Sequence, residues 1–91
     1  MDRAEALELL RASHRFPGPY RFRVVVPAGR RAAVVTAIQA LAGERLVEVG
    51  EQPSRKGTYI SLRLTLTLGA AEEVLEVYEL IRAIDGVRAV M

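Results

Sequence analysis

The chain has 91 residues, of which 51% are hydrophobic and 26% charged, and its formal net charge is +2. The length predicts one domain, the absence of cysteine excludes disulfides and thiolate chemistry, and no apolar run approaches the roughly 20 residues of a membrane span. The net charge is smaller than that of most nucleic-acid-binding domains, and the charged N-terminus lacks the apolar stretch of a signal peptide. We therefore expect a soluble cytoplasmic protein that does not contact a membrane.

The first predicted element is a short helix that begins after Asp2 and ends near Ser13. Asp2 is a good N-cap, and Glu5 three positions later completes a capping-box pattern. The Phe-Pro-Gly-Pro segment at 16–19 cannot continue a helix, because proline lacks the amide donor. Residues 1–15 are thus predicted to be a helical extension, and the sequence leaves open whether it packs on the rest of the chain.

A strand and a helix are predicted next. Tyr20 to Val26 reads as a strand, because apolar side chains occupy every second position. The turn at 27–29 leads into a helix, which Gly43 ends. The apolar stripe of this helix has helical spacing and consists of Val34, Ile38 and Leu41.

Two further strands are predicted in the middle of the chain. The shorter one runs from Arg45 to Gly50, and its alternation places Val47 and Val49 inward, with Leu46 and Glu48 outward. A loop at 51–57 then leads to the clearest signal in the chain, leucine or isoleucine at every second position from Ile60 to Leu68. This pattern predicts a long central strand with one face buried.

A last helix and a last strand complete the pattern. Glu72 and Glu73 lie in the first turn of the helix, where the helix dipole favours acidic side chains. Its predicted buried stripe consists of Val74, Val77, Tyr78, Ile81 and Ile84. The Asp-Gly pair at 85–86 turns the chain into a short strand at 87–91.

The order of these elements predicts an α+β fold, the ferredoxin-like βαββαβ sandwich, over residues 1–91. In this fold two helices cover one face of a four-stranded antiparallel sheet with strand order 4-1-3-2. The first and third strands are then central neighbours, and the second and fourth strands are edges.

The sheet face opposite the helices is the first candidate site, since nothing in this fold covers it. Arginines on adjacent strands suit an anion or an acidic partner. The alternatives are a solvated face with one Glu–Arg pair, or a homodimer surface. The side chains predicted on this face are Arg21, Arg23, Tyr59, Ser61, Arg63, Thr65 and Arg88, with Glu48 on an edge.

The same topology occurs in RNA-binding sheets, and the Lys-Gly-Thr-Tyr-Ile run at 56–60 partly matches their long-strand motif. That motif needs stacking aromatics at the positions that Thr58 and Ile60 hold here. Both positions are in phase with the buried leucines, which argues against nucleic acid as the partner.

Two loops are further candidate sites. Arg30 and Arg31 lie in the first turn of a helix, where an anion would offset their unfavourable interaction with the helix dipole. Alternatively, both side chains reach into water. Lys56 and Gly57 lie in a basic loop that either closes on a ligand or is no more than a hairpin connection.

Catalysis and metal binding find little support. His14 is the single histidine, no cluster has the spacing of metal ligands, and neither a Walker loop nor a dinucleotide fingerprint occurs. We expect no catalytic residues, no metal and no cofactor.

Three motifs between residue 16 and the C-terminus point to a family: Phe16-Pro17-x-x-Tyr20-x-Phe22-x-Val24, Ser54-x-Lys56-Gly57-x-Tyr59-Ile60-Ser61, and Val77-Tyr78-Glu79-x-Ile81 continued by Ile84-Asp85-Gly86-Val87-Arg88-x-Val90-Met91. In order and spacing they resemble the YbeD-like family of small bacterial proteins. Its members are uncharacterised or provisionally labelled as lipoic acid-binding regulatory proteins. The resemblance implies a ferredoxin-like fold similar to the ACT-type regulatory domain of phosphoglycerate dehydrogenase. This chain departs from the family at 26–29, where relatives more often place glycine directly after the aliphatic run.

From the residues and the resemblance together we expect a non-enzymatic regulatory or binding module. It would sense a small acidic ligand or dock on a partner protein, and the resemblance adds a link to lipoate. The alternative is a structural protein that self-associates through its sheet as a homodimer. The candidate ligand contacts are Arg30, Arg31, Lys56, Gly57, Tyr59, Arg21, Arg23 and Arg63.

Overall fold

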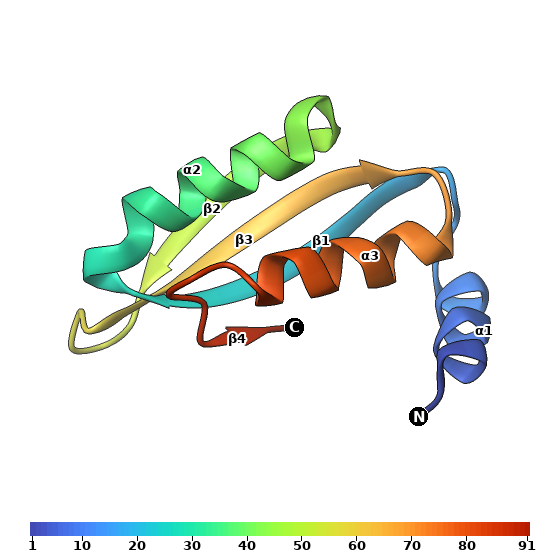
Figure 1. Cartoon of the computed structure of the whole chain (residues 1–91), viewed down its shortest axis with the longest axis horizontal. Helices are drawn as coiled ribbons and strands as arrows, with labels where there is room; N and C mark the ends of the chain where they lie inside the picture. The colour runs from blue at the N-terminus through green and yellow to red at the C-terminus, as the bar shows by residue number, and fades with distance from the viewer.

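The computed structural model describes all 91 residues and confirms the predicted architecture. Its elements in chain order are α1 (Arg3–Ser13), β1 (Gly18–Pro27), α2 (Arg31–Ala42), β2 (Leu46–Pro53), β3 (Tyr59–Leu68), α3 (Ala71–Arg82) and β4 (Ala89–Val90), with 3-10 turns η1 (Ala28–Arg30) and η2 (Gly43–Arg45) on either side of α2. The four strands form one antiparallel sheet in the order β2-β3-β1-β4, with α2 and α3 across one face (Figure 1). No helix combines the length and the apolar character that crossing a membrane requires.

The apolar core lies between the sheet and these two helices. Leu62, Leu64, Leu66 and Leu68 of β3 are at most 1% exposed, which confirms the predicted alternation. On β1, Val24 pairs with Leu62 and Phe22 pairs with Leu64, so the same face of both central strands is buried. The helices cover this face with Val34 and Ile38 of α2 and with Val74, Val77 and Ile81 of α3.

Strand β2 differs from its predicted register at Val47. This side chain was expected to point inward, but it is 64% exposed. Leu46 pairs with Leu66, whereas Glu48 already pairs with Thr65, so Val47 is the extra residue of a β-bulge. Because of the bulge, Leu46 and Val49 both pack against the core although they are three positions apart, and the outward prediction for Leu46 is also wrong.

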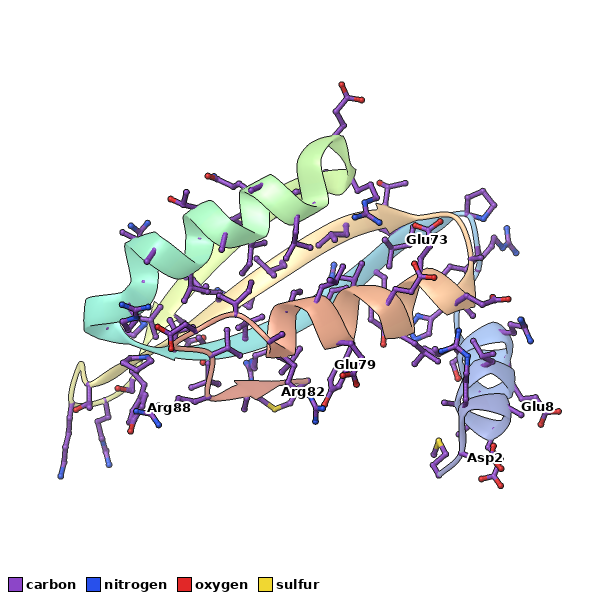
Figure 2. The ribbon with its side chains drawn as sticks, in the orientation of Figure 1. Asp2, Glu8, Glu73, Glu79, Arg82 and Arg88 are labelled. Carbon is purple, nitrogen blue, oxygen red and sulfur yellow. The ribbon has the colours of Figure 1, made fainter.

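The last strand is shorter than the predicted 87–91. Its pairing with β1 covers Val24 with Val90 and Val25 with Ala89, and Met91 adds two backbone hydrogen bonds with Arg23. Arg88 was expected on the open face. It directly precedes β4, and its side chain points away from the sheet (Figure 2). The open face instead receives Met91 beside Arg23.

Helix α1 lies beside the first turn of α3 rather than over the sheet (Figure 1). Its predicted cap is present, since the Asp2 carboxylate accepts a hydrogen bond from the Glu5 amide at 2.8 Å. Arg11 pairs with Glu72 of α3 at 2.9 Å, yet no residue of α1 is buried. The helix is therefore a peripheral element, attached by this ion pair and by the partly buried Leu10, which packs against the core.

Candidate functional site

The uncovered face of the sheet contains a hollow of about 600 Å³. Strand pairing places its side chains in rows that run across the sheet. One row contains Gly50 of β2, Arg63 of β3, Arg23 of β1 and Met91 at the end of β4. The next row contains Glu48, Thr65 and Arg21. All seven residues line the hollow.

Arg23 and Arg63 are directly opposite each other on neighbouring antiparallel strands. Like charges in this arrangement repel each other, because side chains of directly paired residues lie side by side. Five ion pairs occur in the structure, and none includes Arg21, Arg23 or Arg63. Glu48 also forms none, so the single Glu–Arg pair considered for this face is not formed. The hollow therefore carries an excess of positive charge.

The Arg63 side chain lies beside Gly50 of β2, at a distance where an added Cβ would make ordinary van der Waals contact. A Cβ atom at Gly50 would lie 3.7 Å from Arg63 Nε and 3.8 Å from Arg63 Cβ. The guanidinium thus lies against a strand that has no side chain at this position. Met91 bounds the same row on the far side of Arg23, where it provides an apolar wall.

The two turn arginines have partners within the protein. Arg30 donates to Asp85 Oδ2 at 2.6 Å, and Arg31 donates from Nε and from Nη2 to the two carboxylate oxygens of Glu51, the second bond at 2.6 Å. The hydrogen bond from Arg31 lowers the pKa of Glu51, and the same bond raises the pKa of Arg31. These guanidinium groups hold the start of α2 against β2 and against the α3–β4 turn, and they do not join the sheet arginines.

Asp85 and Gly86, which belong to the family motif, act in the same contact. Gly86 has φ of 98°, and a Cβ there would lie 3.0 Å from Arg30 Nε. Glycine at this position therefore permits both the backbone turn and the close approach of the Arg30 side chain.

The basic loop is the hairpin connection between β2 and β3. Ser54 Oγ accepts a hydrogen bond from the Tyr59 amide at 3.0 Å. The Gly57 amide donates a hydrogen bond to the Ser54 carbonyl at 3.0 Å, and Gly57 has φ of 75°. Lys56 and Tyr59 are exposed, and neither lines the hollow. The Ser-x-Lys-Gly-x-Tyr motif thus closes a hairpin, which is one of the two alternatives that the sequence predicts for this loop.

The structure therefore brings together three of the predicted contacts, Arg21, Arg23 and Arg63, and leaves the other five elsewhere. Gly50 and Met91 were not predicted as part of the site. Alternation beyond Val49 was the one available signal for Gly50, because it places the next residue outward. The position of Met91 depends on how β4 pairs with β1, which the pattern of a short strand does not specify.

The single histidine has an aromatic environment. The His14 ring lies 4.8 Å from the Tyr20 ring and 6.3 Å from the Phe16 ring, measured between centroids. It packs where α1 meets β1 and lies outside the hollow.

Fold and site together define a small α+β protein of the ferredoxin-like class with a cationic hollow on its open sheet face. A family model described as "Protein of unknown function (DUF493)" matches residues 11–91, and the chain belongs to this family. The resemblance to the YbeD-like group of small bacterial proteins is thereby confirmed.

One relative and one solved structure are similar to this chain. A UPF0250 protein of Shewanella halifaxensis is 32% identical over 78 residues, which cover 84% of this chain and 88% of the relative. The solution structure of protein HP0495 from H. pylori has a TM-score of 0.70 at 14% identity and covers 87% of this chain and 86% of its own. This likeness supports the fold. Neither the family nor the relative carries an enzymatic name.

Proposed function

We propose that the protein is a non-enzymatic binding module whose open sheet face binds an acidic group, either on a small ligand or on a partner protein. The observation that carries this proposal is the Arg23–Arg63 pair, two arginines at directly paired positions of β1 and β3 that line the hollow and form no ion pair with Glu48 or any other carboxylate. A bound anion would turn their repulsion into two attractive contacts.

The chemistry of the hollow suits a carboxylate. A guanidinium group donates two parallel hydrogen bonds to one carboxylate, and such charge-assisted bonds are stronger than neutral ones. Thr65 adds a hydroxyl donor in the neighbouring row, and Met91 adds an apolar contact. A carboxylate attached to a short apolar group matches this combination.

A regulatory role and a link to lipoate enter the proposal through the family resemblance. Lipoate and octanoate carry one carboxylate on an apolar chain, and amino acids also carry a carboxylate. These compounds are therefore the first to test.

Thermal unfolding with a panel of lipoate, octanoate and amino acids tests the ligand version. A ligand at ten times its Kd stabilises the folded state by about 1.4 kcal/mol, which raises the Tm of a chain of this size by several degrees. We expect the Arg63→Gln variant to lose this shift and the matched Arg55→Gln variant, in the hairpin loop, to retain it. A panel that never shifts the Tm of the wild-type protein would count against a small-ligand sensor.

Self-association through the sheet is the second candidate function. Val47 on the edge strand β2 and Met91 directly after β4 have apolar side chains that are 64% and 61% exposed, respectively, and that a second copy could cover. Size-exclusion chromatography with light scattering discriminates the two functions, because a protein that stays monomeric at high concentration does not self-associate through its sheet.

A further inference from the structure

The outer edge of β1 is only half covered by β4. Pairing reaches from Val25 to Arg23, where the Arg23 amide donates to the Met91 carbonyl at 3.0 Å and the Met91 amide donates back at 2.8 Å. From Gly18 to Phe22 no strand pairs with this edge, and β4 ends well short of α1 in Figure 1. In an antiparallel pair every second residue bonds to the same neighbour, so the amide and carbonyl of Arg21 point to the same edge as those of Arg23. They are free to pair with another strand.

This free edge lies between two hollows of opposite character. On the open face lies the cationic hollow with Arg21, Arg23 and Arg63. On the helix side lies an apolar groove of about 370 Å³ between α1, α3 and β1, whose lining includes Leu9, Leu10, Leu75 and Tyr78. Phe22 and Met91 line both. No acidic residue lines the groove, and the labelled Asp2 and Glu8 point away from the rest of the molecule (Figure 2).

We propose that this edge binds an extended peptide segment of a partner protein in which acidic and apolar residues alternate. Side chains along a strand point alternately to the two faces of a sheet. A segment that pairs antiparallel with Arg21 and continues the line of β4 therefore presents one set of side chains to the arginines and the other set to the apolar groove. Acidic residues fit the first set and aliphatic residues fit the second. Backbone pairing supplies affinity, and the alternating side chains supply specificity.

A second copy of the chain is a poor occupant for the same edge. Antiparallel pairing of two β1 edges around a two-fold axis would bring Arg21 and Arg23 of both copies together on one face. The charge of this face thus favours an acidic partner. The inference rests on the proposed function, because it assigns the same arginines to the acidic side chains of a peptide.

Binding of labelled synthetic heptapeptides, followed by fluorescence anisotropy, tests the inference. In the antiparallel arrangement, the peptide residue opposite Arg21 has its side chain on the same face as Arg21 and exchanges both backbone hydrogen bonds with it. The amides that pair with β1 therefore belong to the acidic residues of the peptide. We therefore compare three peptides of alternating residues. The first contains glutamate and N-methylated valine, the second contains N-methylated glutamate and valine, and the third contains lysine and N-methylated valine. We expect the first to bind at least tenfold more tightly than the other two.

Two measurements on the protein locate the peptide. The Arg21→Glu variant should lose at least tenfold in affinity for the first peptide, whereas the matched Arg55→Glu variant, in the hairpin loop, should bind like the wild type. Circular dichroism checks that both variants are folded. Amide hydrogen exchange of Arg21 in the wild-type chain should slow at least tenfold when the first peptide is saturating.

Each contrary outcome overturns the inference. Equal binding of the two glutamate peptides would show that the edge amides are not used. Protection of the Arg21 amide in a dimer without peptide would assign the edge to a second copy. Small acids that raise the Tm while no peptide binds would leave the proposed function in place and remove this inference. If neither small acids nor peptides bind, both fail.

Discussion

The turn arginines and the sheet arginines differ in whether a carboxylate of the protein lies next to the guanidinium group. Arg31 donates two hydrogen bonds to Glu51, and Arg30 donates one to Asp85, so these groups connect elements. Arg23 faces Arg63 across two strands and has no carboxylate within ion-pair distance. The first group is used within the fold, and the second is available to an outside anion.

The Arg31–Glu51 contact predicts a pH dependence of stability. Because the folded-state pKa of Glu51 is lowered, the contact stabilises the protein fully above the unfolded value of about 4.3 and is lost as the pH falls through the lower folded value. We expect the stability difference between the wild type and Glu51→Gln to be largest near neutral pH and to vanish at the acid end. Urea unfolding at a series of pH values measures it. The matched Glu76→Gln variant should follow the wild type, and a Glu51→Gln variant that also does so would contradict the prediction.

We expect the Gly86→Ala variant to be less stable than the wild type for two reasons. Alanine is strained at φ of 98°, and its Cβ would lie 3.0 Å from Arg30 Nε. Backbone strain of this kind costs about 1–3 kcal/mol. Gly29→Ala is the matched control, because nothing lies within 4 Å of its added Cβ and its φ is not positive. Equal free energies of unfolding for the two variants would contradict the account of this turn.

Among the elements, β3 and α3 follow from periodicity because their patterns are long. The ten residues of β3 alternate without interruption, and the buried stripe of α3 has helical spacing. Strand β2 does not follow from alternation, because the bulge at Val47 shifts the phase between Leu46 and Val49. The bulge becomes visible only when the pairing with β3 is known.

Alternation predicts that Val47 and Val49 both point inward, whereas the bulge places only Val49 against the core. We therefore expect alanine substitutions at these two positions to lower the free energy of unfolding by different amounts. Val47→Ala removes an exposed side chain and should change the free energy of unfolding by less than about 0.5 kcal/mol. Val49→Ala removes a side chain that packs against the core and should cost about 1 kcal/mol or more. Chemical denaturation of both variants measures the difference. A larger cost at Val47 than at Val49 would mean that the bulge lies elsewhere.

At the scale of the molecule, the topology determines which distant residues meet. Arg31 and Glu51 are 20 positions apart, Arg30 and Asp85 are 55 apart, and Arg11 and Glu72 are 61 apart. The sequence pattern singled out Arg30 and Arg31 but not Arg11, and it indicated no partner for any of the three, because many carboxylates were available and only the fold selects among them. The sheet arginines could be predicted, since their face depends on local alternation alone.

The attachment of α1 predicts uneven local stability. No residue of α1 is buried, whereas four leucines of β3 are at most 1% exposed. Local opening requires little free energy where few apolar contacts are lost. We expect α1 amides to exchange with deuterium much faster than β3 amides, as measured by NMR. Comparable protection in the two elements would show that α1 is integral to the core.

The binding role of the open face is tested most directly by NMR of the arginine side chains. The Nε–Hε signals of assigned arginines are followed while the acid that gives the largest thermal shift is added. We expect the signals of Arg21, Arg23 and Arg63 to move together with one binding constant, and those of Arg30 and Arg31 to stay in place because their guanidinium groups are bound to Asp85 and Glu51. Movement of the two turn signals while the three sheet signals remain unchanged would contradict the proposed site.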